Sequence, residues 1–306
     1  MTMWEEIVDA INAVNGSHPG FRAVHAKGTV CEGTFTATPE AAKLSKAAHL
    51  QGDTVKTTVR FSNASGNPHT SDANPIAGRG IGIKFHLPDG EATDMAAVPL
   101  VVFMVRNPED FLAFTQARAN DPETGEPDPD KVMAFVAAHP ETANALQRGL
   151  PKLAPTTSFA TSSYNGLHAF ALVDADGNET WGRYQWHPVE GEHYLNEEQL
   201  DEAGRDYLQE EIRERLAAGD AKFRLDFVLA QDGDSLTDPT EEWPEDREVV
   251  TLGELTVTDV IEEPPASEGP LVFDPTNDTD GWKLSDDKIL AARGPAYSVS
   301  IDRRMA

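Results

Sequence analysis

The 306-residue sequence contains a single cysteine, Cys31, which excludes a disulfide within the chain and a zinc site built from several cysteines. It is also poor in basic residues: 25 Lys and Arg stand against 52 Asp and Glu, a net charge of −27. That charge repels nucleic-acid phosphates and anionic membrane surfaces. No run approaches 18 apolar residues, and the first segment carries acids where a secretory signal carries Lys or Arg. We therefore expect a soluble, cytoplasmic protein with neither nucleic acid nor membrane as a partner.

The apolar residues, 39% of the chain, are sufficient for a sizeable core. Three kinds of pattern indicate strands: many β-branched residues, alternation of apolar and polar residues, and continuous apolar runs. They predict about eight strands, at residues 29–38, 55–63, 81–87, 100–105, 168–173, 180–187, 223–230 and 249–257. Helical spacing predicts helices at residues 1–16, in three segments between 107 and 153, at 196–217 and at 286–306. We expect an α+β fold in one domain, 1–306, in which an antiparallel β-barrel core carries inserted and C-terminal helices.

Two short segments place polar residues among apolar neighbours near the first strands. Residues 21–28 (FRAVHAKG) contain His25, which is either a buried structural histidine or a functional one. Residues 59–62 (VRFS) place Arg60 and Ser62 on the same face of a strand. An arginine in such a strand needs a fixed anion, because burying an unpaired charge is costly. An ordinary salt bridge would supply that anion, and so would the carboxylate of a ligand.

Two further pairs lie on predicted helices. Phe111 and Phe114 are three residues apart, a spacing typical of core packing. Arg293 and Tyr297 are four apart near the C-terminus, which places the guanidinium beside the phenol on a helix. A neighbouring guanidinium stabilises phenolate over phenol. Pairs of this kind occur by chance in many chains, so neither identifies a function alone.

In their order along the chain, these segments resemble the heme catalase superfamily, and within it the short catalase-related peroxidases that keep only the β-barrel core. The resemblance extends over nearly the whole sequence. It is carried by RAVHAKG, VRFSNASG, GRGIGIKFHLPDG, VVFMVRNPEDF, YNGLHAFALVDADGNETWGRYQWHP, EEWPEDREVVTLGELTV, LVFDPTND and DDKILAARGPAYS. Each segment alone is weak, and their shared order makes coincidence improbable.

The resemblance implies a heme b cofactor. Its iron would be bound by the phenolate oxygen of Tyr297, the ligation generally described for catalase. Arg293 matches the arginine that keeps this phenol ionised. Arginines that match positions paired with the heme propionates are Arg22, Arg60 and Arg304, and a guanidinium suits that role because it binds a carboxylate through two hydrogen bonds.

On the other side of the heme, the resemblance implies that His25 is the distal acid–base group and that Ser62 fixes its tautomer. Val24 and Phe111 match residues that pack on the distal heme face. The implied reaction reduces hydrogen peroxide or an organic peroxide through an oxoferryl intermediate. A second peroxide then closes the cycle in a catalase, or a small organic reductant does so in a peroxidase. Either activity would serve the oxidative stress response.

The sequence departs from the family pattern in three respects. Residues 93–100 (TDMAAVPL) lack the asparagine that catalases place on the distal side, and the chain ends nine residues after Tyr297. We therefore expect a peroxidase with weak catalase activity at most, and a homodimer as its assembly. Gly294 and Pro295 also lie between Arg293 and Tyr297. Because proline disrupts a helix interior, either the proximal helix begins or kinks there, or the pair departs from helical spacing.

Two alternatives stay open from the sequence. One is a heme enzyme that processes fatty-acid hydroperoxides, which requires a long apolar channel. The other is a heme- or lipid-binding barrel without catalysis, which the absent distal amide favours and the retained His25 and Ser62 oppose.

Overall fold

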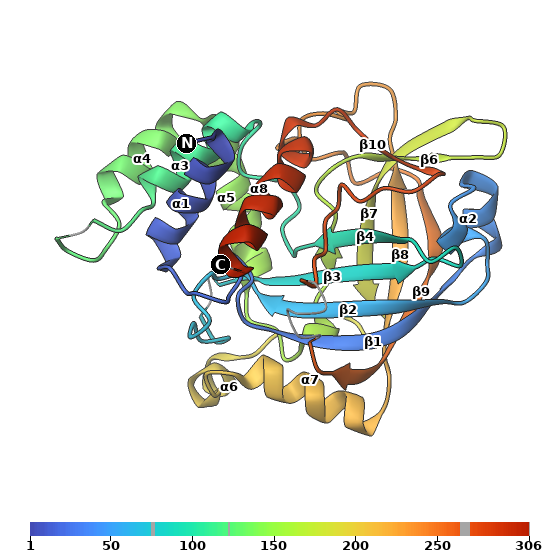
Figure 1. The fold of residues 1–306 in the computed structure, drawn as a ribbon, viewed down its shortest axis with the longest axis horizontal. Coiled ribbons are helices and arrows are strands. Elements are labelled where there is room, and N and C mark those ends of the chain that lie inside the picture. Colours follow the sequence, from blue (N-terminus) through green and yellow to red (C-terminus); the bar gives the residue numbers. More distant parts are fainter. Residues whose placement is uncertain (75–76, 122, 264–269, 306) are drawn as a thin grey trace.

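The computed structural model describes residues 1–74, 77–121, 123–263 and 270–305. Within them the strands are β1 (Gly28–Ala37), β2 (Val55–Asn63), β3 (Arg79–His86), β4 (Ala92–Ala97), β5 (Tyr164–Asn165), β6 (Phe170–Val173), β7 (Glu179–Pro188), β8 (Ala221–Leu229), β9 (Val249–Ile261) and β10 (Trp282–Leu284). These ten form one sheet in the order β10-β6-β7-β8-β9-β1-β2-β3-β4, with β5 paired to β7 beside that path. All the pairings are antiparallel (Figure 1).

The pairing of β1, β2 and β3 shapes the surface on which the site lies. Valine and threonine dominate β2, which suits a pleated and half-buried strand. Its register places Ser62 between Gly28 of β1 and Gly80 of β3, and Arg60 opposite Gly82 of β3. Glycines therefore border the polar face of β2 and leave room for side chains above it.

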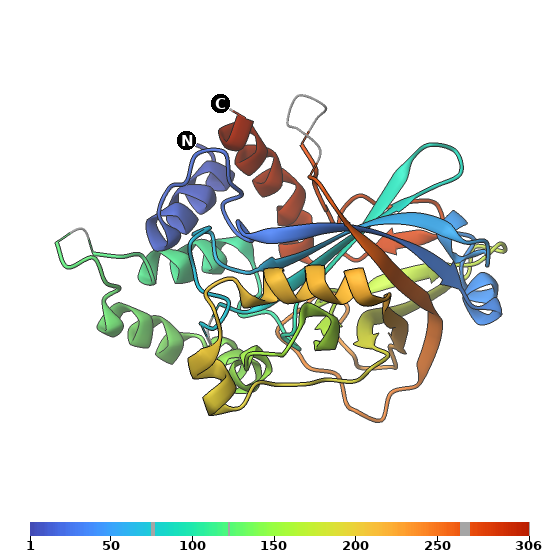
Figure 2. The same ribbon diagram turned by 90° about the horizontal axis from the view of Figure 1, so that it is seen from below.

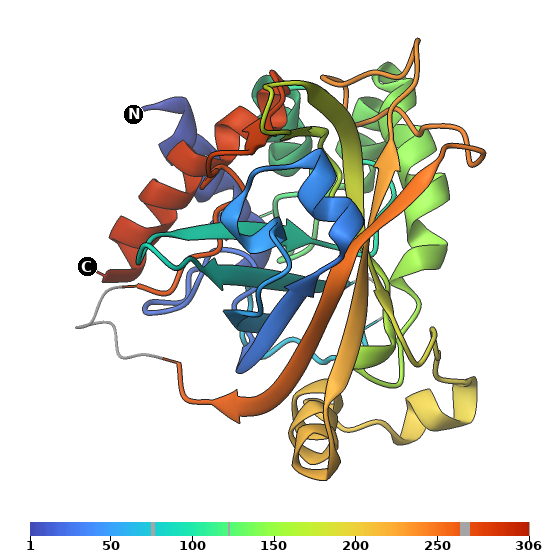
Figure 3. The ribbon, with the colours of Figure 1, turned by 90° about the vertical axis from the view of Figure 1, so that its right-hand side faces the viewer.

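The sheet is strongly curled, so that β8 and β9 rise steeply against β2 and β3 (Figure 3). Its inner face encloses a core rich in buried aromatic rings, among them Phe35, Phe61, Phe85, Tyr164, Trp186, Phe223, Phe227 and Trp282. Cys31 is fully buried in the same core, and burial raises the pKa of its thiol to about 12. The predicted α+β fold around an antiparallel barrel-like sheet is confirmed, in the form of a half-barrel.

The helices are α1 (Met3–Asn15), α2 (Pro39–Leu44), α3 (Pro108–Ala117), α4 (Pro129–Ala138), α5 (Pro140–Gly149), α6 (Glu197–Glu202), α7 (Tyr207–Ala218) and α8 (Lys288–Met305). Helices α1, α3, α4 and α8 gather at one end of the sheet, where α1 and α8 lie side by side, and α7 lies beneath the strands (Figures 1 and 2). A second apolar cluster, Val105, Phe114, Phe135 and Ile289, joins α3, α4 and α8. Among the described residues, no helix combines the length and the apolar character needed to cross a bilayer.

Some sequence predictions of elements were wrong. Residues 100–105 do not form a strand. The chain leaves the sheet after β4, and Val102 and Val105 are buried outside it, so this apolar run reflects burial rather than strand pairing. The predicted helix at 196–217 is two helices, α6 and α7, separated around Gly204. Strands β5 and β10 contain two and three residues, too few for a periodic pattern.

Helix α8 is continuous although Pro295 lies inside it. Because proline has no N–H group, the carbonyl of Ala291 lacks its usual helical partner. The helix nevertheless keeps Arg293 and Tyr297 one turn apart, and their side chains are hydrogen-bonded. The sequence left open whether the helix begins at Pro295 or whether Arg293 and Tyr297 depart from helical spacing. Both of these alternatives are wrong.

Candidate heme site

A cavity of about 420 Å³ lies where α1, α3 and α8 face strands β2, β3 and β4. Its wall is mainly apolar and includes Ile7 and Ile11 of α1 and Leu100. The structure brings all nine residues predicted for the site to this wall: Arg22, Val24, His25, Arg60, Ser62, Phe111, Arg293, Tyr297 and Arg304. The cavity therefore has a histidine and a tyrosine together with several arginines in a largely apolar setting.

His25 and Ser62 form a hydrogen-bonded pair at the cavity wall. The distance from His25 Nδ1 to Ser62 Oγ is 2.9 Å, and Ser62 Oγ donates weakly to the carbonyl oxygen of Gly80 at 3.4 Å. We assign the one hydroxyl hydrogen of Ser62 to the carbonyl oxygen of Gly80 and the proton of the imidazole to Nδ1, an arrangement in which both contacts of Ser62 Oγ are hydrogen bonds. Nε2, on the other side of the ring, is then an unprotonated acceptor. A side chain at Gly80 would crowd this arrangement, since its Cβ would lie 2.6 Å from His25 Cε1.

The surroundings keep His25 neutral. Burial first, and then the positive charges of Arg60, Arg293 and Arg22, together lower the pKa of His25 to about 3. A neutral imidazole at physiological pH can accept a proton at Nε2. The pair has the properties of a general base that can return the proton as an acid.

Tyr297 and Arg293 form the second polar pair of the cavity. Arg293 donates to Tyr297 Oη from Nη2 at 2.7 Å and from Nε at 3.2 Å. Burial opposes the charge on Arg293, but Tyr297, Tyr184 and Asp274 together outweigh it and raise the pKa of the guanidinium. Two N–H groups of one guanidinium thus converge on this oxygen, and a phenolate oxygen is a strong ligand for ferric iron.

The sequence analysis assigned no role to two residues that continue this pair into the protein. Arg293 Nη1 lies 3.4 Å from His168 Nε2, and His168 Nδ1 lies 2.6 Å from the carboxylate of Asp287. Burial, only partly offset by Asp287, lowers the pKa of His168, so Nδ1 carries the proton and donates to Asp287. Asp287 also accepts from the backbone N–H groups of Ile289 and Leu290 at the start of α8. It therefore fixes both the helix and His168.

Removal of the Asp287 side chain tests this arrangement. We expect Asp287→Ala to lower the free energy of unfolding by about 2–4 kcal/mol, because His168 loses a buried acceptor and α8 loses its cap. Asp287→Asn should lower the free energy of unfolding by about half as much. Its amide has one oxygen that accepts and an NH2 group that cannot, so it keeps either the bond from His168 or the cap of α8. Urea denaturation of the heme-free chain measures both. Equal stability of Asp287→Ala and the wild type would contradict the role of Asp287.

One edge of the cavity is cationic. Arg22 donates to both carboxylate oxygens of Glu263, at 2.6 and 3.2 Å, and to the carbonyl of Leu271 at 2.9 Å. The partly buried Arg304 lies near enough for the charge of Arg22 to contribute to lowering its pKa, after the larger effect of burial. Glu263 was not predicted as a site residue, because it is 241 positions from Arg22 in the sequence and no local pattern indicates that the two side chains are in contact.

Arg60 is the most deeply buried member of this edge, with 4% of its surface exposed. Its Nη atoms donate to the carbonyl oxygens of His25 at 3.0 Å and Ala26 at 3.3 Å. Its Nε is buried without a hydrogen-bond partner among the described residues, 3.9 Å from Glu263. Burial and the charges of Arg22 and Arg304, partly offset by Glu263, lower the pKa of Arg60 to about 9, so Glu263 compensates the charge of Arg60 only in part.

The residues present fit heme. The edge carries a net charge of +2, from the three arginines Arg22, Arg60 and Arg304 and the one carboxylate of Glu263. The two propionates of heme would neutralise this charge. The unpartnered Nε of Arg60 offers a buried donor to such a carboxylate. The apolar wall suits a porphyrin face, and Val24 leaves 38% of its surface exposed for such a contact.

The wall near His25 offers no free amide donor in the described structure. Ala97 and Val98 line the cavity within the segment where an asparagine was missing from the sequence. Asn165 also lines it, but its Nδ2 donates to the carbonyls of Pro99 at 3.2 Å and Leu100 at 3.1 Å. Both amide hydrogens are thus engaged, and Asn165 does not replace the missing donor.

Comparison with known proteins gives one consistent family. The family model described as Catalase matches residues 6–306. A protein named catalase-related peroxidase from Mycolicibacterium paratuberculosis is 37% identical over 300 residues, which cover 98% of this chain and 94% of that relative. Another of the same name, from Synechococcus elongatus, is 35% identical over 302 residues, which cover 98% of this chain and 88% of the relative.

Solved structures agree in fold. A fungal catalase superposes with a TM-score of 0.83 at 20% identity, and catalase A from Saccharomyces cerevisiae with 0.82 at 19%. Both matches cover 98% of this chain, but only 62% and 64% of the longer proteins. The chain thus spans about three-fifths of the length of these solved structures.

Proposed function

Because the chain belongs to the catalase family and is an oxidoreductase that acts on peroxide, we propose that it is a heme b peroxidase with a small organic reductant. The observation that carries this proposal is the cavity that joins the His25–Ser62 pair, the Arg293–Tyr297 pair and the arginine edge. The earlier resemblance to catalase-related peroxidases is confirmed. We further propose a single domain and a cytoplasmic homodimer.

We infer that Tyr297 Oη would be the iron ligand and that the arginine edge would hold the propionates. Heme, when bound, supplies an iron that peroxide can oxidise and that an organic donor can reduce again. Arg293 would hold Tyr297 Oη in its anionic form through its two hydrogen bonds. His168 and Asp287 would keep Arg293 in place from behind.

His25 would perform the proton transfers. Its neutral Nε2 can take the proton from one oxygen of the peroxide and deliver it to the other, which then leaves as water or an alcohol. Ser62 would keep the proton of the ring on Nδ1, so that Nε2 faces the cavity as an acceptor. Arg60 would hold the segment that carries His25 through the carbonyl oxygens of His25 and Ala26.

The cavity wall supports peroxidase over catalase activity. The oxidation of a second peroxide requires that this molecule be positioned beside His25. With Ala97 and Val98 at the wall and the amide of Asn165 engaged, the described residues leave no side-chain amide to hold it. An organic donor that gives up single electrons does not need this contact.

An assay with and without a donor tests the proposal. We expect the heme-loaded chain to oxidise two molecules of a phenol by one electron each for every peroxide consumed, with little oxygen released. Oxygen release at half the rate of hydrogen peroxide consumption would indicate a catalase. Rearrangement of a fatty-acid hydroperoxide without any donor would instead indicate the alternative heme enzyme.

A further inference from the structure

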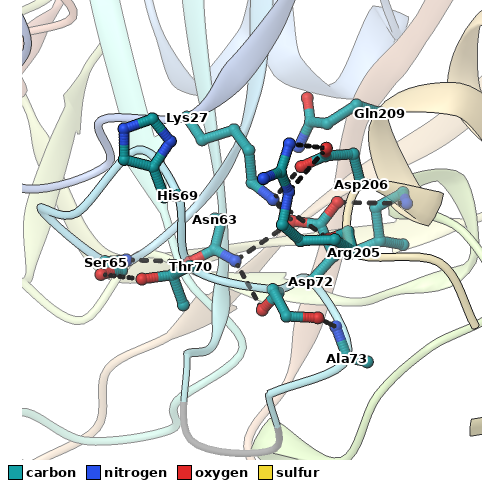
Figure 4. A network of polar contacts seen from close by, with 12 residues as sticks. Lys27, Asn63, Ser65, His69, Thr70, Asp72, Ala73, Arg205, Asp206 and Gln209 are labelled. Atoms are coloured by element: carbon teal, nitrogen blue, oxygen red, sulfur yellow. Dashed lines mark hydrogen bonds and ion pairs between the residues drawn. The ribbon is translucent and has the colours of Figure 1, made fainter. Parts of the chain in front are cut away.

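A buried polar network lies on the far side of β2 from the cavity, and Asp72 is at its centre. The carboxylate of Asp72, which is not exposed, pairs with Lys27 Nζ at 2.9 Å. It also accepts from Asn63 Nδ2 at 3.1 Å and from the backbone N–H of Leu208 in α7 at 3.2 Å. Figure 4 shows Asp72 and Asn63 turned toward one another within this network. In the described structure these four residues are not part of the cavity wall.

The network is connected to both members of the His25–Ser62 pair. Asn63 follows Ser62 on β2, so their side chains lie on opposite faces of the strand. A bond from Asn63 to Asp72 therefore fixes the direction of Ser62. Lys27 follows His25 by two residues, and its backbone carbonyl accepts from the N–H of Asn63 at 3.0 Å. The same carboxylate thus holds the two segments that carry the pair.

His25 needs such an anchor because its backbone is strained. Its φ of 56° lies in the left-handed region, and among the described residues it is the one non-glycine residue with a positive φ. A conformation of this kind is unfavourable for a residue with a side chain and persists only when its surroundings determine it. His25 N–H donates to the carbonyl of Ala64 at 3.3 Å and Ala26 N–H to that of Ser65 at 2.9 Å, while Arg60 binds the carbonyl oxygens of His25 and Ala26. Lys27, the next residue, is held by Asp72.

We propose that Asp72, acting through Lys27 and Asn63, is a positioning residue for the hydrogen bond between His25 and Ser62. Asp72 does not contact the reacting atoms. It holds the strained segment and the end of β2 in register, so that His25 keeps its proton on Nδ1. The effect on peroxide reduction rests on the proposed function, whereas the effect on the imidazole requires no heme.

The variant Asp72→Asn tests this proposal, because it keeps the size of the side chain and removes the buried one of the two carboxylates that bind Lys27. The other carboxylate, that of the more exposed Asp206 at 2.8 Å, stays in place. We expect the ¹⁵N spectrum of histidine-labelled, heme-free protein to change for His25, from the Nδ1–H tautomer to a mixture of the two tautomers. The rate constant of the heme-loaded variant with hydrogen peroxide should fall at least about tenfold, since small misplacements of a catalytic group have effects of this size. The affinity for hemin should stay within twofold.

Asp234→Asn is the matched control. The side chains of Arg247 and Asp234 are 13% and 4% exposed, close to the 12% and 0% of Lys27 and Asp72. Asp234 likewise accepts one backbone N–H, that of Gln231 at 2.8 Å. This variant should leave the tautomer of His25 and the peroxide rate unchanged.

If Asp72→Asn does not fold, Lys27→Met provides the same test with the hydrogen bonds of Asp72 intact, and Lys27→Arg should restore the Nδ1–H tautomer. A folded Asp72→Asn or Lys27→Met protein with an unchanged His25 spectrum overturns the proposal. So does an equal change in the Asp234→Asn control. If the tautomer changes while the wild type fails to reduce peroxide, the positioning role stands and the proposed peroxidase function is wrong.

Discussion

The variant His25→Ala is expected to reduce peroxide roughly 10²- to 10⁴-fold more slowly than the wild type, the usual contribution of a positioned acid–base group. Without the imidazole, no group beside Ser62 takes the proton from the attacking oxygen and returns it to the leaving one. Hemin should still bind, because the Tyr297–Arg293 pair and Arg22 are unaltered. Stopped-flow absorbance after hemin loading measures the rate.

The pH dependence of the wild type follows from the same residue. Since burial and then the neighbouring arginines lower the pKa of His25 to about 3, the imidazole is already neutral at pH 5. The rate should therefore be constant between pH 5 and pH 8 and fall only as the pH approaches 3. His187→Ala, which replaces a histidine outside the cavity wall, is the control for His25→Ala and should keep the wild-type rate. A rate that halves near pH 6.5, or an undiminished rate in His25→Ala, would contradict the assignment.

The second large effect is expected from Tyr297→Phe, which removes one oxygen atom and leaves the ring. The affinity for hemin should fall at least roughly 100-fold, equivalent to about 2.8 kcal/mol, because the iron loses its anionic ligand. The heme-free variant should also lose about 1–3 kcal/mol of stability, because the buried donors Nε and Nη2 of Arg293 lose their acceptor. A Soret titration and urea denaturation measure the two effects separately.

Tyr194→Phe is the matched control for this experiment. Tyr194 is 42% exposed and its hydroxyl donates to Glu192, away from the cavity wall. This variant should bind hemin like the wild type. If Tyr297→Phe also binds hemin with wild-type affinity and an unchanged absorption spectrum, Tyr297 is not the ligand.

Most of the sheet was predictable because its strands carry long apolar patterns. Residues 55–63 alternate and became β2 with the same bounds, and residues 180–187 fall within β7. Continuous apolar runs were less informative, since residues 100–105 contribute the buried Val102 and Val105 without pairing to a strand. Hydrophobicity indicates that a segment is buried, but not what buries it.

The site residues that the sequence missed depend on long-range contacts. Asp287 has a local signal, since an aspartate just before an apolar helical pattern is a typical cap. Its hydrogen bond with His168 joins residues that are 119 positions apart in the sequence, and the bond between Arg22 and Glu263 joins residues that are 241 positions apart. No local pattern specifies such pairs. The nine predicted residues were found together because an ordered family resemblance carries that long-range information.

Titration of the heme-free wild type with hemin, followed by absorption spectroscopy, tests the central claim most directly. The account predicts saturation at one heme per chain and the spectrum of a ferric heme with an anionic oxygen ligand. A chain that stays colourless after gel filtration, or that gives the spectrum of a histidine-ligated heme, would contradict it.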